Sequence, residues 1–110
     1  MPRITYDTDF SVTLSTEGDY LRVGFNRDRN QITEFRVQYE MTHGGEIRPV
    51  IRCDCAHGFP HCDVLDYDGR NIEKIRLPEN QPLKQVFDRV VDELKAHWRT
   101  YRTAFLERQQ

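Results

Sequence analysis

The chain has 110 residues, of which 31% are charged, and a formal net charge of −2. This length allows one hydrophobic core, and no apolar run approaches the roughly 20 residues that a membrane-spanning helix needs. The first seven residues lack the apolar core of a signal peptide. We therefore expect a single cytoplasmic domain over residues 1–110, without a membrane partner.

The first half of the chain reads as antiparallel strands. Residues 1–9 have no clear period and are predicted to form an N-terminal arm. From Phe10 to Met41, apolar and polar residues alternate, which is the pattern of half-buried strands. Turn-forming residues interrupt the alternation around Gly18 and over residues 27–30. The clearest strand is expected to have one apolar face, made of Phe35, Val37, Tyr39 and Met41.

Residues 43–46 have the sequence of a two-residue hairpin turn. That register would set Tyr39 opposite Val50 and Val37 opposite Arg52, which mixes the two faces of the sheet. We therefore predict one more residue in the loop, so that Val37 pairs with Ile51. The other pairs in this predicted register are Met41 with Ile47, Phe35 with Cys53, Glu40 with Arg48 and Arg36 with Arg52.

The predicted register gathers Arg22, Arg36 and Arg52 into a row on the polar face. Like charges directly opposite one another destabilise a sheet. The row is therefore either balanced by the neighbouring carboxylates or serves to bind an anion. A balanced face is the simpler interpretation, because exposed ion pairs are weak evidence of function. The anion-binding hypothesis names Arg22, Arg36 and Arg52.

The second half continues the sheet and then changes to a helix. Residues 62–67 read as a strand, Asp68-Gly69 as a hairpin turn, and apolar residues up to Leu77 as a last strand. Prolines at 78 and 82 end the sheet and begin a helix over residues 81–106. The sequence therefore predicts an α+β fold: an antiparallel β-meander of five to six strands within residues 10–77, packed against one long C-terminal helix.

Apolar residues recur at three- and four-residue spacing along this helix, so one face should cover the sheet. Its length exceeds that of the strands, and its last turns are expected to overhang the sheet. Trp98, Tyr101 and Arg102 are candidate partner-binding residues there, because their types are enriched at interface hot spots. The alternative is that Trp98 and Tyr101 continue the core stripe.

Residues 52–63 contain all three cysteines and two histidines, which are zinc-ligand types. Their spacing does not match the knuckles of structural zinc sites, and Cys53 and Cys55 should both point to the apolar face. We expect no metal and no cofactor, although a zinc-binding domain remains an alternative. In a reducing compartment the cysteines are expected to be thiols or metal ligands rather than a disulfide framework.

The same segment is also a candidate acid/base site. Asp54 lies on the polar face, and a bend at residues 58–60 can bring His57 and His61 toward it. Arg52 would then stabilise developing negative charge, as on a phosphodiester. The alternative is that His57 caps the corner and His61 packs under the helix.

The run from Pro49 to Asp63, with the Asp68-Gly69 turn that follows, resembles a group of small bacterial proteins. Their shared core is Arg-x-Asp-x-Ala-His-Gly-x-x-His-x-Asp, and the similarity covers about residues 19–106. The matching residues here are Arg52, Asp54, His57, Gly58, His61 and Asp63. The central run is more distantly similar to TumE-type components of toxin–antitoxin pairs.

This resemblance implies a small protein from a toxin–antitoxin-like or mobile-element setting, with RNA as a candidate ligand and an antitoxin-like protein as a candidate partner. In this hypothesis Asp54, His57 and His61 are catalytic. Helices precede the sheet in RelE- and ParE-like toxins, so their activities are not carried over to this strand-first chain. The competing hypothesis is a non-enzymatic interaction module that binds a partner, or a second copy of itself, through the C-terminal helix.

Overall fold

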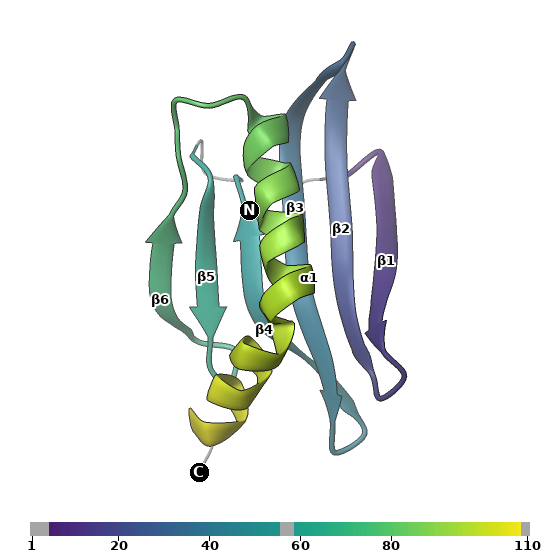
Figure 1. Ribbon diagram of the computed structural model, residues 1–110, viewed down its shortest axis with the longest axis vertical. Helices are drawn as coiled ribbons and strands as arrows, with labels where there is room; N and C mark the ends of the chain where they lie inside the picture. Colours follow the sequence, from purple (N-terminus) through teal and green to yellow (C-terminus); the bar gives the residue numbers. More distant parts are fainter. Residues whose placement is uncertain (1–4, 56–58, 109–110) are drawn as a thin grey trace.

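The computed structural model describes residues 5–55 and 59–108. Six strands precede one helix along the chain (Figure 1). The strands are β1 (Thr8–Ser15), β2 (Asp19–Asp28), β3 (Gln31–His43), β4 (Glu46–Asp54), β5 (His61–Leu65) and β6 (Asn71–Arg76), and the helix is α1 (Leu83–Arg108). Neighbours in sequence are antiparallel neighbours in one sheet, in the order β1-β2-β3-β4-β5-β6. The predicted α+β meander with a C-terminal helix is confirmed.

The turn between β3 and β4 differs from the predicted one. His43 pairs with Glu46, and the two glycines between them have positive φ values of 61° and 78°, as a tight hairpin turn requires. The predicted extra loop residue is therefore wrong. A bulge between Tyr39 and Glu40 instead shifts the register, so that Tyr39 pairs with Ile51. Pro49 lies in this irregular stretch, where a missing backbone donor is tolerated.

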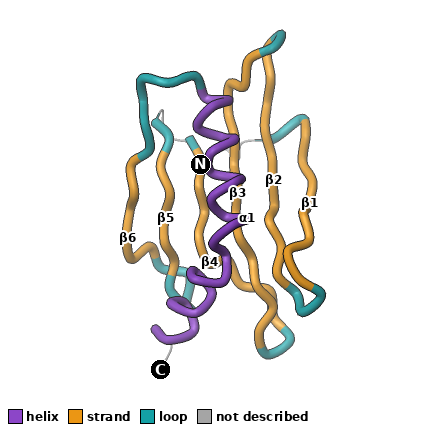
Figure 2. The backbone as a smooth tube through the Cα atoms, viewed as in Figure 1, coloured by secondary structure: helices purple, strands orange, loops and turns teal. Residues whose placement is uncertain are grey.

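One helix covers only the middle of this sheet. α1 crosses in front of β3 and β4, while β1 and the β5–β6 side extend beyond it (Figures 1 and 2). A helix is about 10–12 Å wide with its side chains, whereas six strands at about 4.8 Å spacing span roughly 24 Å. The buried side chains of α1 are Val86, Val90, Leu94, Trp98 and Phe105. Two flanks of the apolar face therefore remain beside the helix.

Beyond a kink, the last turns of α1 run past the lower ends of β5 and β6 and pack on the β5–β6 turn (Figures 1 and 2). His97 has non-helical angles (φ −125°, ψ 16°), and the helix changes direction there (Figure 2). Beyond this kink Phe105 is fully buried, with its ring 5.6 Å from that of Tyr67. Arg108 donates from Nη2 to the carbonyl of Leu65 at 3.3 Å. The kink thus brings an apolar residue of the last turns into the core, at the end of the sheet that these turns reach beyond.

A disulfide joins β4 to β5. Cys53 and Cys62 are directly opposite each other and are bonded through their sulfur atoms. The expectation that all three cysteines are thiols or metal ligands is wrong for this pair, because the β4–β5 register places both on the apolar face. Cys55 is the free thiol. Its sulfur accepts a hydrogen bond from the backbone N–H of Phe35 at 3.3 Å, and burial raises its pKa.

A buried polar network fastens the second half of α1 to the start of β2. The hydroxyl of Tyr39 donates to Oδ1 of Asp19 at 2.6 Å, and Ser15 donates to Oδ2 of the same carboxylate at 2.6 Å. Arg102 of α1 places Nε 3.6 Å from Asp19 Oδ1. Burial, and then the bond to Asp19, raises the pKa of Tyr39.

In the part of the chain that the structure describes, α1 is the helix, and it lacks the apolar stretch that a membrane-spanning helix needs.

Candidate functional sites

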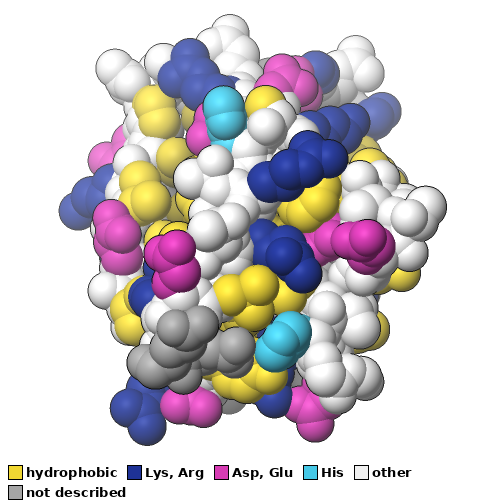
Figure 3. Space-filling model, turned by 60° about the horizontal axis from the view of Figure 1, so that its bottom comes forward, with side chains coloured by type: hydrophobic (Ala, Val, Ile, Leu, Met, Phe, Trp, Pro, Cys, Tyr) yellow, Lys and Arg dark blue, Asp and Glu magenta, His cyan; other side chains and the backbone are white. Residues whose placement is uncertain are grey.

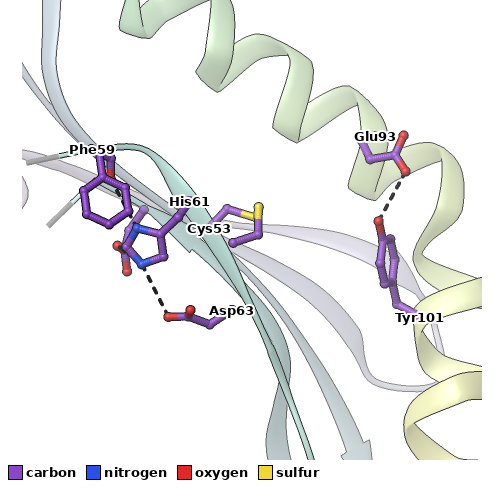
Figure 4. Close-up of a disulfide and its surroundings, with 8 residues drawn as sticks. Cys53, Phe59, His61, Asp63, Glu93 and Tyr101 are labelled. Atoms are coloured by element: carbon purple, nitrogen blue, oxygen red, sulfur yellow. Dashed lines mark hydrogen bonds and ion pairs between the residues drawn. A yellow bond between two sulfur atoms is a disulfide. The ribbon is translucent and has the colours of Figure 1, made fainter. Parts of the chain in front are cut away.

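The face of the sheet that points away from α1, the outer face, carries a polar cluster of Asp54, His61 and Asp63. Asp54 and His61 are directly paired between β4 and β5, and Asp63 lies two residues beyond His61 on the same face. His61 Nε2 is 3.5 Å from Asp54 Oδ1 and 3.4 Å from Asp63 Oδ2. Figure 4 shows the imidazole directed toward Asp63, on the other side of the strand from the disulfide. The structure thus brings together two of the three predicted acid/base residues.

The imidazole of His61 is enclosed, with only 2% of the residue exposed. Its Nδ1 lies 3.1 Å from the carbonyl oxygen of Phe59, which can only accept a hydrogen bond (Figure 4). The Phe59 ring lies over it, with centroids 5.2 Å apart. Both ring nitrogens therefore face oxygen atoms, an arrangement that two N–H donors can satisfy. This geometry suits a link between the two strands better than a base that must reach a substrate.

Basic side chains surround the cluster. Arg52 is paired with Asp63, and Lys74 Nζ lies 3.8 Å from Asp63 Oδ1. Arg76 is paired with His61, and its guanidinium lies 4.5 Å from the centre of the Phe59 ring. His57 lies outside the described residues. The sequence pattern included Asp63 but not Lys74 or Arg76, whose positions depend on the β5–β6 pairing.

The predicted row of three arginines is wrong. Gln38 stands opposite both Arg22 and Arg52, and it accepts a hydrogen bond from Arg52 Nε at 2.6 Å. Arg36 stands opposite Asp54 instead, with Nη2 3.1 Å from Asp9 Oδ1. The bulge in β3–β4 causes this shift. Carboxylates thus lie beside the arginines on the outer face. On a different surface, the lower end of the molecule in Figure 1, basic and acidic side chains are also interspersed (Figure 3).

Tyr6 is a residue of this face that the sequence pattern missed. Its ring covers Gly24, where an added Cβ would lie 2.9 Å from Tyr6 Cγ. The guanidinium of Arg36 lies 5.0 Å from the ring centre. Burial, followed by the nearby charge of Asp54, raises the pKa of Tyr6. The arm residues have no periodicity, so only the coordinates place this ring near the polar cluster.

A groove lies on the opposite, apolar face between α1 and β6, and we call it the β6 groove. Its volume is about 250 Å³. The disulfide and Ile51 contribute to its sheet side, Ile75 and Leu77 border it, and Val86, Val90 and Leu94 line its helix side. Arg89 and Glu93 are the charged residues of its lining. All six residues of β6 are exposed, so the groove opens beside an uncovered strand.

The candidate partner-binding residues of α1 do not form one surface. Trp98 is 6% exposed and packs edge-to-face on Tyr39, with ring centroids 6.0 Å apart. Arg102 is directed to Asp19. Tyr101 lines the β6 groove, and its hydroxyl donates to Glu93 Oε1 at 3.3 Å (Figure 4).

Among residues 5–55 and 59–108, no group of three or more His, Cys, Asp or Glu side chains is placed so that it could hold a metal ion. Cys53 and Cys62, two of the candidate zinc ligands, share their sulfur atoms in the disulfide.

Comparison with known proteins gives one family. No curated protein and no solved structure matches the sequence. A family model described as "Domain of unknown function (DUF7718)" matches residues 5–110, which include all six strands and the helix. The chain therefore belongs to the DUF7718 family.

Proposed function

We propose that this protein is a non-enzymatic interaction module that binds an extended segment of a protein partner along β6. The observation that carries the proposal is the combination of an exposed edge strand with an apolar groove on its inner side. Edge strands present unpaired backbone groups, and many domains bind peptides by adding a strand to such an edge.

The groove favours a protein segment over a small metabolite. Its volume of about 250 Å³ lies below the roughly 300–1,000 Å³ of small-molecule sites. A strand added beside β6 would direct every second side chain toward the helix side of the sheet. Apolar side chains at those positions would pack on Ile75, which is 37% exposed, and enter the groove beside it.

Charge on the outer face indicates the chemistry of the partner. The side chains of Lys74 and Arg76 are 46% and 67% exposed. Residues of an added strand that point to the outer face would meet them, and acidic residues give favourable cross-strand pairs. We infer a partner segment in which apolar and acidic residues alternate.

A second copy of β6 fits this edge poorly. Two copies of β6 could pair antiparallel with their apolar faces on the same side of the sheet. In each register centred on residue 73, 74 or 75, such pairing places like charges opposite one another. Centring on Glu73 opposes two glutamates, centring on Lys74 opposes two lysines, and centring on Ile75 opposes Lys74 to Arg76. Like charges in these positions are destabilising. The edge therefore selects a partner of different sequence.

The test uses two labelled eight-residue peptides, one alternating acidic and β-branched residues and one with lysine in place of each acid. Fluorescence anisotropy should show binding of the acidic peptide and much weaker binding of its basic twin. The double variant Lys74→Glu, Arg76→Glu should reverse this preference. We expect the Kd of each peptide to change by about tenfold, which corresponds to about 1.4 kcal/mol of binding free energy for the two charge reversals together.

The matched control is Lys95→Glu with Arg99→Glu, which changes the charge equally at exposed positions of α1. This variant should bind both peptides as wild type does. Equal binding of the two peptides by wild type, or an equal effect of the control, would overturn the proposal.

A second candidate function, in a toxin–antitoxin-like or mobile-element setting, is acid/base chemistry on RNA. The observation that favours it is the 3.5 Å approach of Asp54 to His61, with Arg52 on the adjacent row. Induced expression with growth and RNA integrity as readouts tests it. Wild type should inhibit growth and cleave RNA, and Asp54→Asn should do neither while melting like wild type. Harmless wild type with intact RNA would remove this candidate.

A further inference from the structure

The two edges of the sheet have different chemistry. β6 carries Glu73, Lys74 and Arg76, and charged edge residues protect a strand from pairing with its own kind. β1 (Thr8–Ser15) has one charged residue, Asp9, and otherwise contains threonine, serine and apolar residues. It nevertheless has the length of a full strand. An edge of this kind, without lysine or proline, is suited to pair with another strand.

The described residues before β1 leave this edge open. The carbonyl of Thr5 accepts a hydrogen bond from Asn26 Nδ2 at 2.9 Å, and the N–H of Asp7 donates to Asn26 Oδ1 at 2.6 Å. The ring of Tyr6 covers Gly24 on the outer face. Residues 5–7 are therefore held against β2, with the Tyr6 ring on the outer face of the sheet. They do not lie along the free side of β1.

The apolar face beside β1 is also incompletely covered. Phe10 is 45% exposed, although its side chain points to the face that α1 covers elsewhere. A second groove, of about 280 Å³, lies between β1 and α1 and is lined by Phe10, Val12, Val23, Phe87 and Val91, with Asp88, Asp92 and Lys95 at its helix side. A second apolar strand next to β1 would cover Phe10.

The register of a self-paired β1 follows from its pattern. A bulge between Thr13 and Ser15 limits regular pairing to the residues before it. Antiparallel pairing centred on Ser11 uses residues 9–13 and keeps the apolar faces of both copies on one side. It sets Phe10 opposite Val12 of the second copy, an aromatic and β-branched pair of the kind that stabilises sheets. Asp9 meets Thr13, so no like charges are opposed.

We propose that β1 is a self-association edge, through which two copies of this chain form one continuous twelve-stranded sheet about a two-fold axis at Ser11. The partner is a second copy because this edge, whose one charged residue meets Thr13, is complementary to itself, whereas β6 is not. The strand pair and the two Phe10 contacts bury less than the roughly 1,600 Å² of a standard interface. The dimer is therefore weak and depends on concentration. It uses the opposite edge from the proposed partner site and does not require that site.

Sedimentation velocity from about 10 µM to 1 mM, the range of weak complexes, measures this equilibrium. Wild type should change from monomer to dimer with rising concentration. Ser11→Lys should remain monomeric, because the two-fold axis sets its charges against each other. Ser11 is exposed, so the variant should melt like wild type.

A mixture of Ser11→Lys and Ser11→Glu provides the rescue. Each variant alone should be monomeric, and the mixture should form a dimer of one copy of each. Ile75→Lys on β6 is the control and should dimerise like wild type. Monomeric wild type at every concentration would overturn the proposal. So would a dimer that Ser11→Lys leaves intact, or a Lys and Glu mixture that stays monomeric.

Discussion

Removing the hydroxyl of Tyr39 should destabilise the protein markedly, because this hydroxyl is a donor to a buried carboxylate. The residue is fully buried, and its hydroxyl donates to Asp19, a carboxylate that is itself buried. Tyr39→Phe keeps the ring and its packing on Trp98 but leaves Asp19 Oδ1 without its 2.6 Å donor. A hydrogen bond to a charged group contributes about 1.5–3 kcal/mol. Arg102 remains 3.6 Å away and offsets part of this loss, so we expect about 2 kcal/mol.

Urea denaturation and thermal melting measure this loss. For a domain of this size, 2 kcal/mol corresponds to a decrease of roughly 8–16 °C in melting temperature. Tyr101→Phe is the matched control, because it removes a hydroxyl whose 3.3 Å bond to Glu93 is exposed. The control should change the free energy of unfolding by less than about 0.5 kcal/mol. Equal effects of the two substitutions would refute the assignment of the Tyr39–Asp19 bond as a buried anchor of the fold.

The same network predicts how stability depends on pH. The pKa of Tyr39 is raised in the folded state, so the folded protein holds this proton more tightly than the unfolded chain does. The contribution is complete below the unfolded pKa of about 10 and is lost as the pH rises above it. Wild-type stability should therefore fall in alkali. Tyr39→Phe should fall less steeply, with the remaining slope due partly to Tyr6 and Tyr101, whose pKa values are also raised.

Leu94→Ala should lower the free energy of unfolding by about 2–5 kcal/mol in a denaturation series, because Leu94 is buried. The control Asp92→Ala, at an exposed position, should have little effect. An unchanged free energy of unfolding for Leu94→Ala would mean that α1 covers the sheet with another face. Thiol titration of unfolded protein should find one thiol per chain before reduction and three after it. In folded protein Cys55 should react slowly, because its raised pKa leaves little thiolate at neutral pH. Replacing both Cys53 and Cys62 by serine should cost roughly 2–4 kcal/mol of stability, and an unchanged melting temperature would argue against the cross-link. His61→Ala should lower the melting temperature, because it leaves two neighbouring carboxylates on a buried site; an unchanged melting temperature would favour a functional role for the imidazole.

The fold was predictable because burial on one face imposes an alternating pattern on each strand. In β3 this pattern identified Phe35, Val37 and Tyr39 as core residues, and the helical spacing of Val86, Val90 and Leu94 did the same for α1. The β3–β4 register was not predictable from alternation alone. A bulge locally suspends the two-residue period, and both Val50 and Ile51 are buried there.

Two further errors have similar local causes. The kink at His97 lacks the proline or glycine that usually marks a bend, so the helix was expected to be straight. The Cys53–Cys62 pair depends on the β4–β5 register, which could not be read across the Gly-Phe-Pro sequence between the two cysteines. A wrong register also produced the expected row of arginines.

The candidate sites were predictable in part. The approach of Asp54 to His61 follows from the antiparallel pairing of β4 and β5, and the sequence pattern anticipated it. That both imidazole nitrogens face oxygen atoms depends on the Phe59 carbonyl and on Asp63, which only the coordinates place. The β6 groove depends on how far one helix reaches across six strands, and no residue pattern in β6 reveals that.

Where a partner segment binds is the most direct test of the proposed function. Backbone amide hydrogen exchange of the ¹⁵N-labelled protein, with and without the acidic β-branched peptide, locates it residue by residue. The proposal predicts that alternate amides of β6, which exchange rapidly in the free protein, become protected, and that signals of Ile75 and of the groove side of α1 shift. Protection confined to β1 or to the outer-face cluster of Asp54, His61 and Asp63, with β6 unchanged, would contradict it.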